Sequence, residues 1–177
     1  MELFSFALSM TGKAMEDQGQ AVIHTPIIDL LDREGVPYRR LPHDGPVFTV
    51  EAAARTRGVR VEEMVKSILL RDKAGRYVMG CVTGEAQIDP QAVRALLPPE
   101  WQRLSFATAD EVRAVTGCVQ GAVAPLNLPP EVPVVFDEAI GRCAKVSISS
   151  GDPMLGLELD PADLARVAGA RMGRIAR

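Results

Sequence analysis

Two apolar segments separated by a short polar turn constrain the fold of this chain more than any other feature. Residues 65–70 and 77–82 are rich in strand-favouring side chains, and residues 72–76 between them contain a turn glycine, Gly75. Apolar runs of this length on either side of a glycine-containing turn are typical of a β-hairpin. We therefore predict that the two segments are neighbouring strands at the centre of a sheet.

Five helix-start signals are distributed along the rest of the sequence. Each combines a side chain that can accept a hydrogen bond from a free backbone amide with a proline or a glutamate in the first turn. The capping residues are Thr25, Thr49, Asp89, Thr108 and Asp160. Short strand-like segments lie at residues 38–41, 132–136, 144–148 and 155–159. Short strands interleaved with helices, together with a tight hairpin, predict an α/β (α+β) fold, one domain with a mixed sheet.

The charge balance limits the partners of the protein. The chain of 177 residues carries 20 Lys+Arg and 23 Asp+Glu, which gives a formal net charge of −3. A protein that coats duplex DNA needs many clustered cations, because its binding depends on counterion release. We therefore expect no DNA binding and only local contacts with any nucleic acid. The cluster Arg55, Arg57 and Arg60 and the C-terminal arginines are typical of solvated faces or helix ends, but they are also the only patches positive enough to hold a phosphate backbone locally.

Cysteine and histidine usage favours a reducing compartment. Cys81, Cys118 and Cys143 are odd in number and far apart, and the two histidines cannot complete a metal site with them. The chain has no Walker A or GxGxxG sequence. We expect a cytoplasmic protein with no metal and no cofactor. The N-terminal apolar run is short and follows Glu2, which argues against a signal peptide or a membrane span, so residues 1–24 are expected to be an N-terminal extension.

Lys66 is the most informative single residue. Because side chains alternate along a strand, Lys66 shares a face with Ile68 and Leu70, which places an ammonium group on an apolar surface. A strand-end lysine can pack its stem there and extend its head to water. The other interpretation is a site lysine that orients an anionic or carbonyl-bearing substrate in a partly desolvated cleft.

The segment 116–125 is a candidate loop for ligand binding. Gly121 allows close approach of the backbone, and exposed amides there could stabilise negative charge on a carbonyl oxygen. The alternative is an ordinary loop after a helix that ends at Gly117. Residues 149–152 could likewise be a simple turn or offer a hydroxyl group to a substrate. No GxSxG sequence surrounds these serines, and the neighbours His43 and Asp44 are more typical of a capping pair than of an acid–base pair.

An ordered set of segments resembles the YbaK/ProX family of aminoacyl-tRNA deacylases, which includes the editing insertion domain of bacterial prolyl-tRNA synthetases. The set comprises the helix at 26–35, the helix start at 48–53, and the segments 65–69 and 121–125. The resemblance runs from residue 25 to the C-terminus, so residues 25–177 are expected to form the editing domain. It implies a compact domain with a curved, mixed, partly barrel-like sheet surrounded by helices.

The resemblance also implies functional residues. Lys66 matches the family's essential lysine, which would orient the substrate while backbone amides near Gly121 stabilise the oxyanion. The implied substrate-binding residues are Phe48, Ser67, Gly121, Pro125, Ser150 and Gly151. Residues 152–155 match neither the arginine-rich turn of many YbaK relatives nor the histidine of some synthetase insertions. His43 and residues 48–50 are closer to ProX and residues 157–161 to YbaK, so the subfamily stays open.

The implied function is trans-editing, the hydrolysis of the ester of a mischarged tRNA. The expected substrate is tRNA-Pro carrying a small wrong amino acid such as alanine, cysteine, serine or threonine. The expected partners are the acceptor end of that tRNA and a synthetase such as prolyl-tRNA synthetase. One alternative is a noncatalytic module that binds a tRNA end or an aminoacyl-adenylate for a synthetase. A third is a small-molecule esterase with a serine nucleophile.

Overall fold

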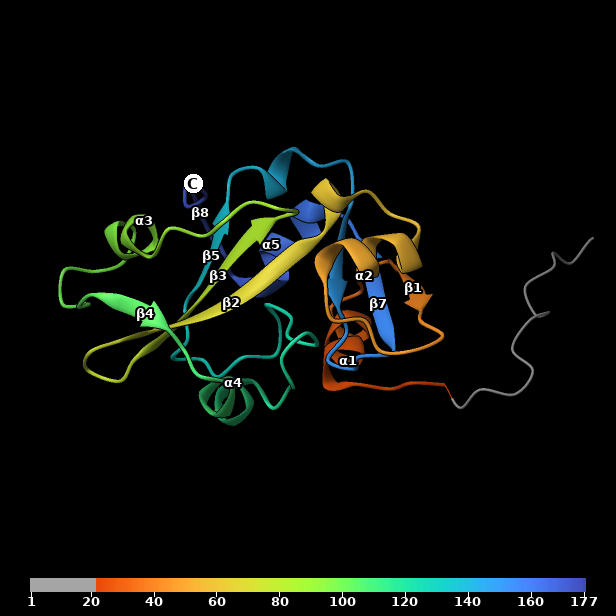
Figure 1. The fold of residues 1–177 in the computed structure, drawn as a ribbon, viewed down its shortest axis with the longest axis horizontal. Helices are drawn as coiled ribbons and strands as arrows, with labels where there is room; N and C mark the ends of the chain where they lie inside the picture. The colour runs from red at the N-terminus through yellow and green to blue at the C-terminus, as the bar shows by residue number, and fades with distance from the viewer. Residues whose placement is uncertain (1–21) are drawn as a thin grey trace, which may run out of the picture.

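The predicted hairpin lies at the centre of the larger of two sheets in the computed structural model, which describes residues 22–177 (Figure 1). Its two strands pair antiparallel from Val65 opposite Thr83 to Arg71 opposite Tyr77. Beside β3 (Tyr77–Thr83), β5 (Val134–Asp137) pairs in parallel, and β8 (Arg171–Gly173) pairs in parallel with β5. On the other side, β4 (Leu104–Phe106) pairs antiparallel with β2 (Val65–Asp72). The strand order is β4, β2, β3, β5 and β8. The hairpin and the mixed α/β class are confirmed.

A second, antiparallel sheet corrects the expectation of a single partly barrel-like sheet. It has the order β1 (Tyr38–Pro42), β7 (Leu155–Leu159) and β6 (Val146–Ser149). In the described part of the chain the two sheets meet edge to edge only through an isolated bridge between Met64 and Ser147, so they do not close into a barrel. The sheets pack apolar faces together rather than continuing one hydrogen-bonded ladder.

All five predicted helix starts are confirmed. The capping side chains of Thr25, Thr49, Asp89, Thr108 and Asp160 each accept a hydrogen bond from a backbone amide in the first turn. The helices are α1 (Pro26–Arg33), α2 (Val50–Arg57), α3 (Pro90–Ala95), α4 (Ala109–Thr116) and α5 (Pro161–Ala168). Short 3₁₀ turns occupy Val61–Glu63 and Ile140–Arg142. The second turn delays the strand expected at 144–148, so β6 begins at Val146.

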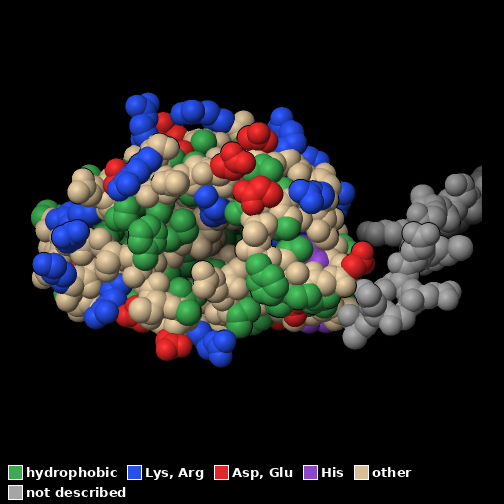
Figure 2. Space-filling view, in the orientation of Figure 1, with side chains coloured by type: hydrophobic (Ala, Val, Ile, Leu, Met, Phe, Trp, Pro, Cys, Tyr) green, Lys and Arg blue, Asp and Glu red, His purple; other side chains and the backbone are tan. Residues whose placement is uncertain are grey.

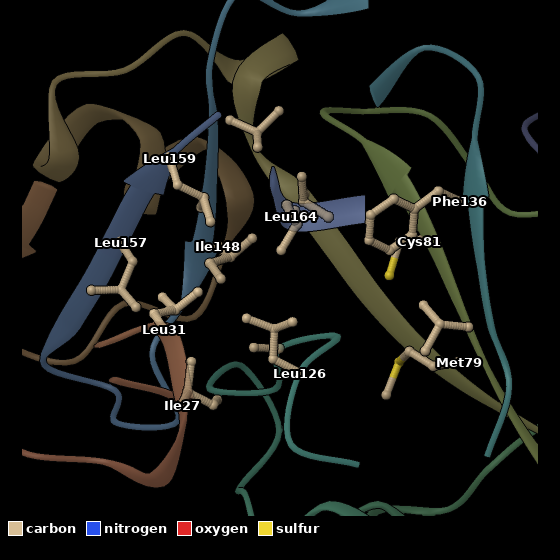
Figure 3. Packing of buried hydrophobic residues seen from close by; sticks show 14 of the residues in the cluster. Ile27, Leu31, Met79, Cys81, Leu126, Phe136, Ile148, Leu157, Leu159 and Leu164 are labelled. Carbon is tan, nitrogen blue, oxygen red and sulfur yellow. The ribbon is translucent and has the colours of Figure 1, made fainter. Parts of the chain in front are cut away.

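The main hydrophobic core lies between the two sheets. Figure 3 shows Met79, Cys81 and Phe136 from the larger sheet opposite Ile148 and Leu157 from the smaller one. Full burial of an aliphatic or aromatic side chain of this size contributes about 1.5–3 kcal/mol, so this layer holds the sheets together. A second cluster, built around Leu70, Val78, Val82 and Trp101, packs on the other face of β2 and β3.

The expected extension at residues 1–24 lies mostly outside the described residues, which begin at Val22. Thr25 is the first buried residue and caps α1. Within residues 22–177, no helix has the length and apolar character needed to cross a bilayer.

Candidate active site

A cleft of about 420 Å³ lies beside the first half of β2. Its walls are one side of α2 with the residues before it, the first half of β2, the connection from β4 into α4, and two loops at 120–123 and 149–153. Figure 2 shows the hollow, with hydrophobic side chains on both sides and acidic side chains along one edge. A cavity of this size falls in the range of small-molecule sites.

Lys66 is the second residue of β2 and lines this cleft. Its side chain is half-buried, and its Nζ donates a hydrogen bond to the carbonyl oxygen of Ala86. The other two ammonium hydrogens stay available to a ligand. Burial lowers the pKa of this lysine, while the negative charges of Glu51 and Glu85 act in the opposite direction. The group is therefore a cation that is already oriented and partly desolvated.

Ser67 and Phe48 also line the cleft. The Ser67 hydroxyl accepts a weak hydrogen bond from the thiol of Cys81 at 3.7 Å. Burial raises the pKa of that thiol to about 12, so Cys81 is not a thiolate nucleophile at neutral pH. Phe48 stands on the rim, with 83% of its surface exposed, and Phe106 stands on the rim from β4, with 62% exposed.

Gly121 lines the cleft with a left-handed backbone, φ +90°, a conformation that favours glycine. Its carbonyl oxygen accepts a hydrogen bond of 3.1 Å from the hydroxyl of Ser149. Ser149 belongs to the segment 149–152, which the sequence offers either as a simple turn or as a source of a hydroxyl group, and it lines the cleft. Strand alternation explains its position, because Ile148 faces the core and its neighbour faces the other way.

Three predicted substrate-binding residues do not line this cleft. Pro125 is buried and borders a separate hollow beside Leu126. Ser150 is fully buried, and its hydroxyl donates to the carbonyl oxygen of Leu155 at 2.8 Å. Gly151 has φ +93° and lies against Ile27. Ser150 and Gly151 shape the turn that carries the next two residues to the cleft.

The structure corrects the interpretation of Arg57 as part of a solvated helix end. Arg57 is only 8% exposed, and it lines the cleft together with His43. Its Nε donates to Nε2 of His43 at 3.0 Å, and its Nη1 donates to the Ser147 hydroxyl and the Ile148 carbonyl, each at 3.1 Å. Burial lowers the pKa of Arg57 to about 10, so the guanidinium stays charged at neutral pH.

The geometry does not support serine-nucleophile chemistry. Among residues 22–177, no serine hydroxyl hydrogen-bonds a histidine, because His43 is engaged by Arg57 and by the Pro153 carbonyl at 2.9 Å. The same bonds leave His43 outside an acid–base pair with Asp44. In the described part of the chain, no three histidine, cysteine, aspartate or glutamate side chains are grouped to hold a metal ion. The cleft instead offers a lysine ammonium, an arginine guanidinium and a glycine-containing loop.

This fold and this cleft define an aminoacyl-tRNA editing domain. The sequence profile of the family described as "Aminoacyl-tRNA editing domain" matches residues 44–167, and the chain belongs to that family. The resemblance to the YbaK/ProX proteins is thereby confirmed.

Individual proteins and a solved structure are also similar to this chain. It is 27% identical over 152 residues to the "Multifunctional Ser/Thr-tRNA deacylase ProXp-y" of Escherichia coli, covering 84% of this chain and 89% of that protein. It is 30% identical over 105 residues to a proline–tRNA ligase of Bacillus licheniformis, covering 59% of this chain and 18% of the ligase. The crystal structure of hypothetical protein APE2540 superposes with a TM-score of 0.78 at 27% identity, covering 85% of this chain and 99% of that one.

Proposed function

We propose that this protein is a trans-editing aminoacyl-tRNA deacylase that hydrolyses the ester of a mischarged tRNA. The observation that carries the proposal is Lys66, a half-buried ammonium held by the Ala86 carbonyl in a cleft that also contains Gly121. Membership of the editing-domain family supports the reaction class. The site of action would be the cytoplasm, where free thiols are maintained.

In this reaction a water molecule attacks the carbonyl carbon that joins the amino acid to the terminal ribose. The bond from that carbon to the ribose oxygen breaks, one proton of the water goes to the ribose oxygen, and the other is released to solvent as the amino acid leaves as a carboxylate. Lys66 would orient the substrate with its free N–H groups, without forming a covalent bond. Backbone amides near Gly121 would stabilise the oxyanion, a contribution that is typically worth ~10²–10³ in rate.

The partner would be the single-stranded acceptor end of the tRNA. Unpaired bases bind proteins by stacking on aromatic rings, and Phe48 and Phe106 present exposed rings on the rim of the cleft. The overall charge of −3 fits such a local contact better than a broad basic surface. We propose Phe48, Ser67 and Gly121 as substrate-binding residues.

We propose tRNA-Pro carrying a small wrong amino acid as the substrate. Similarity to a protein named as a Ser/Thr-tRNA deacylase favours serine or threonine over the other small amino acids. Similarity to a proline–tRNA ligase supports the tRNA and a functional link to prolyl-tRNA synthetase. A separate editing site is needed for such errors, because one methylene provides only ~1–3 kcal/mol of discrimination.

The test is deacylation of tRNA-Pro charged separately with alanine, cysteine, serine, threonine or proline. Wild type should hydrolyse a non-cognate ester, and Lys66→Ala should lower the rate by about 10², the cost of losing a group that positions the substrate. Lys73→Ala is the matched control, because Lys73 is exposed in the β2–β3 turn. Hydrolysis at the spontaneous rate for every species would overturn the proline-specific version. Tight binding of the charged tRNA without hydrolysis would support the noncatalytic binding module instead.

A further inference from the structure

Arg57 is a buried cation without a counter-charge. It is the last residue of α2, it is only 8% exposed, and its side chain contacts β6, β7 and His43. The structure pairs it with no carboxylate in residues 22–177: its hydrogen-bond acceptors are the His43 ring, the Ser147 hydroxyl and the Ile148 carbonyl. Burying a charge without an opposite charge is costly, so this arrangement requires an explanation beyond packing.

One nitrogen of the guanidinium is available to a ligand. Nε and Nη1 make the three hydrogen bonds, and Nη2 makes none with residues 22–177. Every fully buried side-chain nitrogen or oxygen in this part of the chain has a hydrogen-bond partner, so Nη2, which has none there, is not fully buried. Because Arg57 lines the cleft, Nη2 is the guanidinium nitrogen left to donate to a ligand bound there.

The surroundings hold this donor in place. A Cβ atom on Gly156 would lie 2.5 Å from Cζ of Arg57, so β7 leaves room for the guanidinium only because it has glycine there. The Pro153 carbonyl accepts from Nδ1–H of His43, which leaves Nε2 as the acceptor for Arg57 and keeps the ring neutral. Asp152 is the one acidic residue of the cleft wall, and its Oδ1 is occupied by the Met154 amide at 2.7 Å.

We propose that Arg57 is the anchor of an oxyanion subsite in the floor of the cleft, which takes a phosphate or carboxylate group through Nη2. A guanidinium held by two of its nitrogens and open at the third is suited to such a group, since charge-assisted hydrogen bonds to phosphate and carboxylate are the strong ones. The subsite exists independently of the reaction. Its assignment to a mischarged tRNA rests on the proposed function.

Two parts of that substrate carry the required chemistry. One is the phosphate that links the terminal adenosine to the rest of the tRNA. The other is the carboxylate of the amino acid after hydrolysis. Both are anionic oxygen groups, and they differ in which small molecule reproduces them. AMP supplies adenosine with the phosphate, adenosine lacks the phosphate, and free serine supplies the amino-acid carboxylate, with its α-ammonium group, but no phosphate.

The test is titration of the full-length protein with AMP, adenosine, serine and inorganic phosphate, followed by calorimetry and by the side-chain NMR resonance of Arg57 Nε–H. If the phosphate is bound, AMP should bind at least about tenfold more tightly than adenosine and shift the Arg57 resonance. If the carboxylate is bound, serine should shift that resonance and AMP should behave like adenosine. Either result supports the subsite and identifies its source.

Variants separate the subsite from the fold and from the reaction. Arg57→Gln should abolish the tenfold preference while leaving the affinity for adenosine unchanged, and Arg57→Lys should retain part of it. Arg55→Gln is the matched control, because Arg55 lies on the same helix and is exposed. The proposal is overturned if AMP, serine and inorganic phosphate all leave the wild-type resonance unmoved, or if a preference of wild type for AMP over adenosine persists in Arg57→Gln. Anion binding by a protein that hydrolyses no charged tRNA would overturn the proposed function and leave the subsite intact.

Discussion

Two hydrogen bonds hold His43 neutral, because one requires a ring nitrogen that donates and the other requires a ring nitrogen that accepts. Nδ1–H donates to the Pro153 carbonyl at 2.9 Å, and Nε2 accepts from Arg57 at 3.0 Å. Protonation would add a hydrogen at Nε2, where it would face the Arg57 charge. Burial is the main cause that lowers the pKa of His43 below its ordinary value of 6.5, and Arg57 adds to it, whereas the Pro153 carbonyl and Asp152 oppose it.

The stability of the protein should therefore fall as the pH drops below 6.5. The unfolded chain takes up a proton on this histidine near pH 6.5, and the folded chain does so only at lower pH, so the unfolded state binds more protons in between. The loss should have a slope of up to about 1.4 kcal/mol per pH unit for one proton. Urea unfolding of wild type at pH 7.5, 6.5 and 5.5 measures it.

His43→Gln should remove that slope, because the amide oxygen can still accept from Arg57 and does not titrate. The exposed His24 provides the control His24→Gln. An unchanged slope in His43→Gln would assign the pH dependence to other groups. Acidic groups whose pKa is lowered in the folded protein, such as Glu158 beside Arg39, lose their contribution to stability only below about pH 4.5. That pH lies outside the measured range of 7.5 to 5.5.

Lys66 and Arg57 show what a sequence reveals about single residues. The position of Lys66 follows from strand alternation, a local rule, so its place on a partly apolar face could be predicted. Arg57 stands in the last turn of a helix, where arginine is usually solvated. Its burial depends on Ser147, 90 residues later, and on a glycine in β7, and no local pattern contains that information.

The packing of α2 against β7 depends on Gly156, which leaves room for the Arg57 side chain. Gly156→Ala should destabilise the protein by about 1–3 kcal/mol, because the new methyl group would collide with the Arg57 side chain and overpack the contact. The cost should largely disappear in an Arg57→Ala background, where the space is free. Urea unfolding of the two single variants and the double variant measures the coupling.

Gly45→Ala serves as the matched control, since a Cβ atom there would meet nothing within 4 Å and its backbone does not need glycine. Additive free energies in the double variant would contradict the steric account. In that case the requirement for Gly156 would come from β7 itself and not from its contact with α2.

Helices were easier to predict than strands for a physical reason. A cap such as Thr108 with Glu111 acts within one turn, so five helix starts could be identified from adjacent residues. The short strands β4 and β8 were missed because three residues carry no period of their own. Each exists because a longer strand, β2 or β5, offers it a free edge. The division into two sheets was missed for the same reason, since it depends on which faces pack together.

At the scale of the whole molecule, the two sheets and their helices place residues from distant parts of the chain around one cleft. Lys66 comes from the larger sheet, Arg57 from α2, and Ser149 from the end of a strand in the smaller sheet. The site therefore depends on how the sheets are held by the core between them. Its residue set could not be assembled from local motifs; strand alternation made Lys66 a candidate, and the ordered family resemblance made the site interpretation of Lys66 the preferred one.

A last prediction concerns the residue at which the folded and active editing domain begins. The family resemblance predicts that the editing domain begins at residue 25, and within residues 22–177 the contacts nearest the N-terminal end come from the Ile23 carbonyl, which accepts from Arg40 at 2.6 Å, and from Thr25. A protein of residues 22–177 should therefore match the full chain in melting temperature and in deacylation rate. Differential scanning calorimetry and the charged-tRNA assay measure both.

The comparison is a protein of residues 26–177, which removes Thr25 together with Ile23 and its contact with Arg40, and leaves the helical residues of α1 in place. Thr25 caps α1 and also donates from its hydroxyl to the Ser150 carbonyl at 2.7 Å, tying α1 to the turn that carries Asp152 and Pro153 to the cleft. Its loss should cost about 1–2 kcal/mol, or several degrees in melting temperature. If residues 22–177 instead lose as much stability as residues 26–177, or lose activity, then the N-terminal segment belongs to the working domain and the boundary proposed here is wrong.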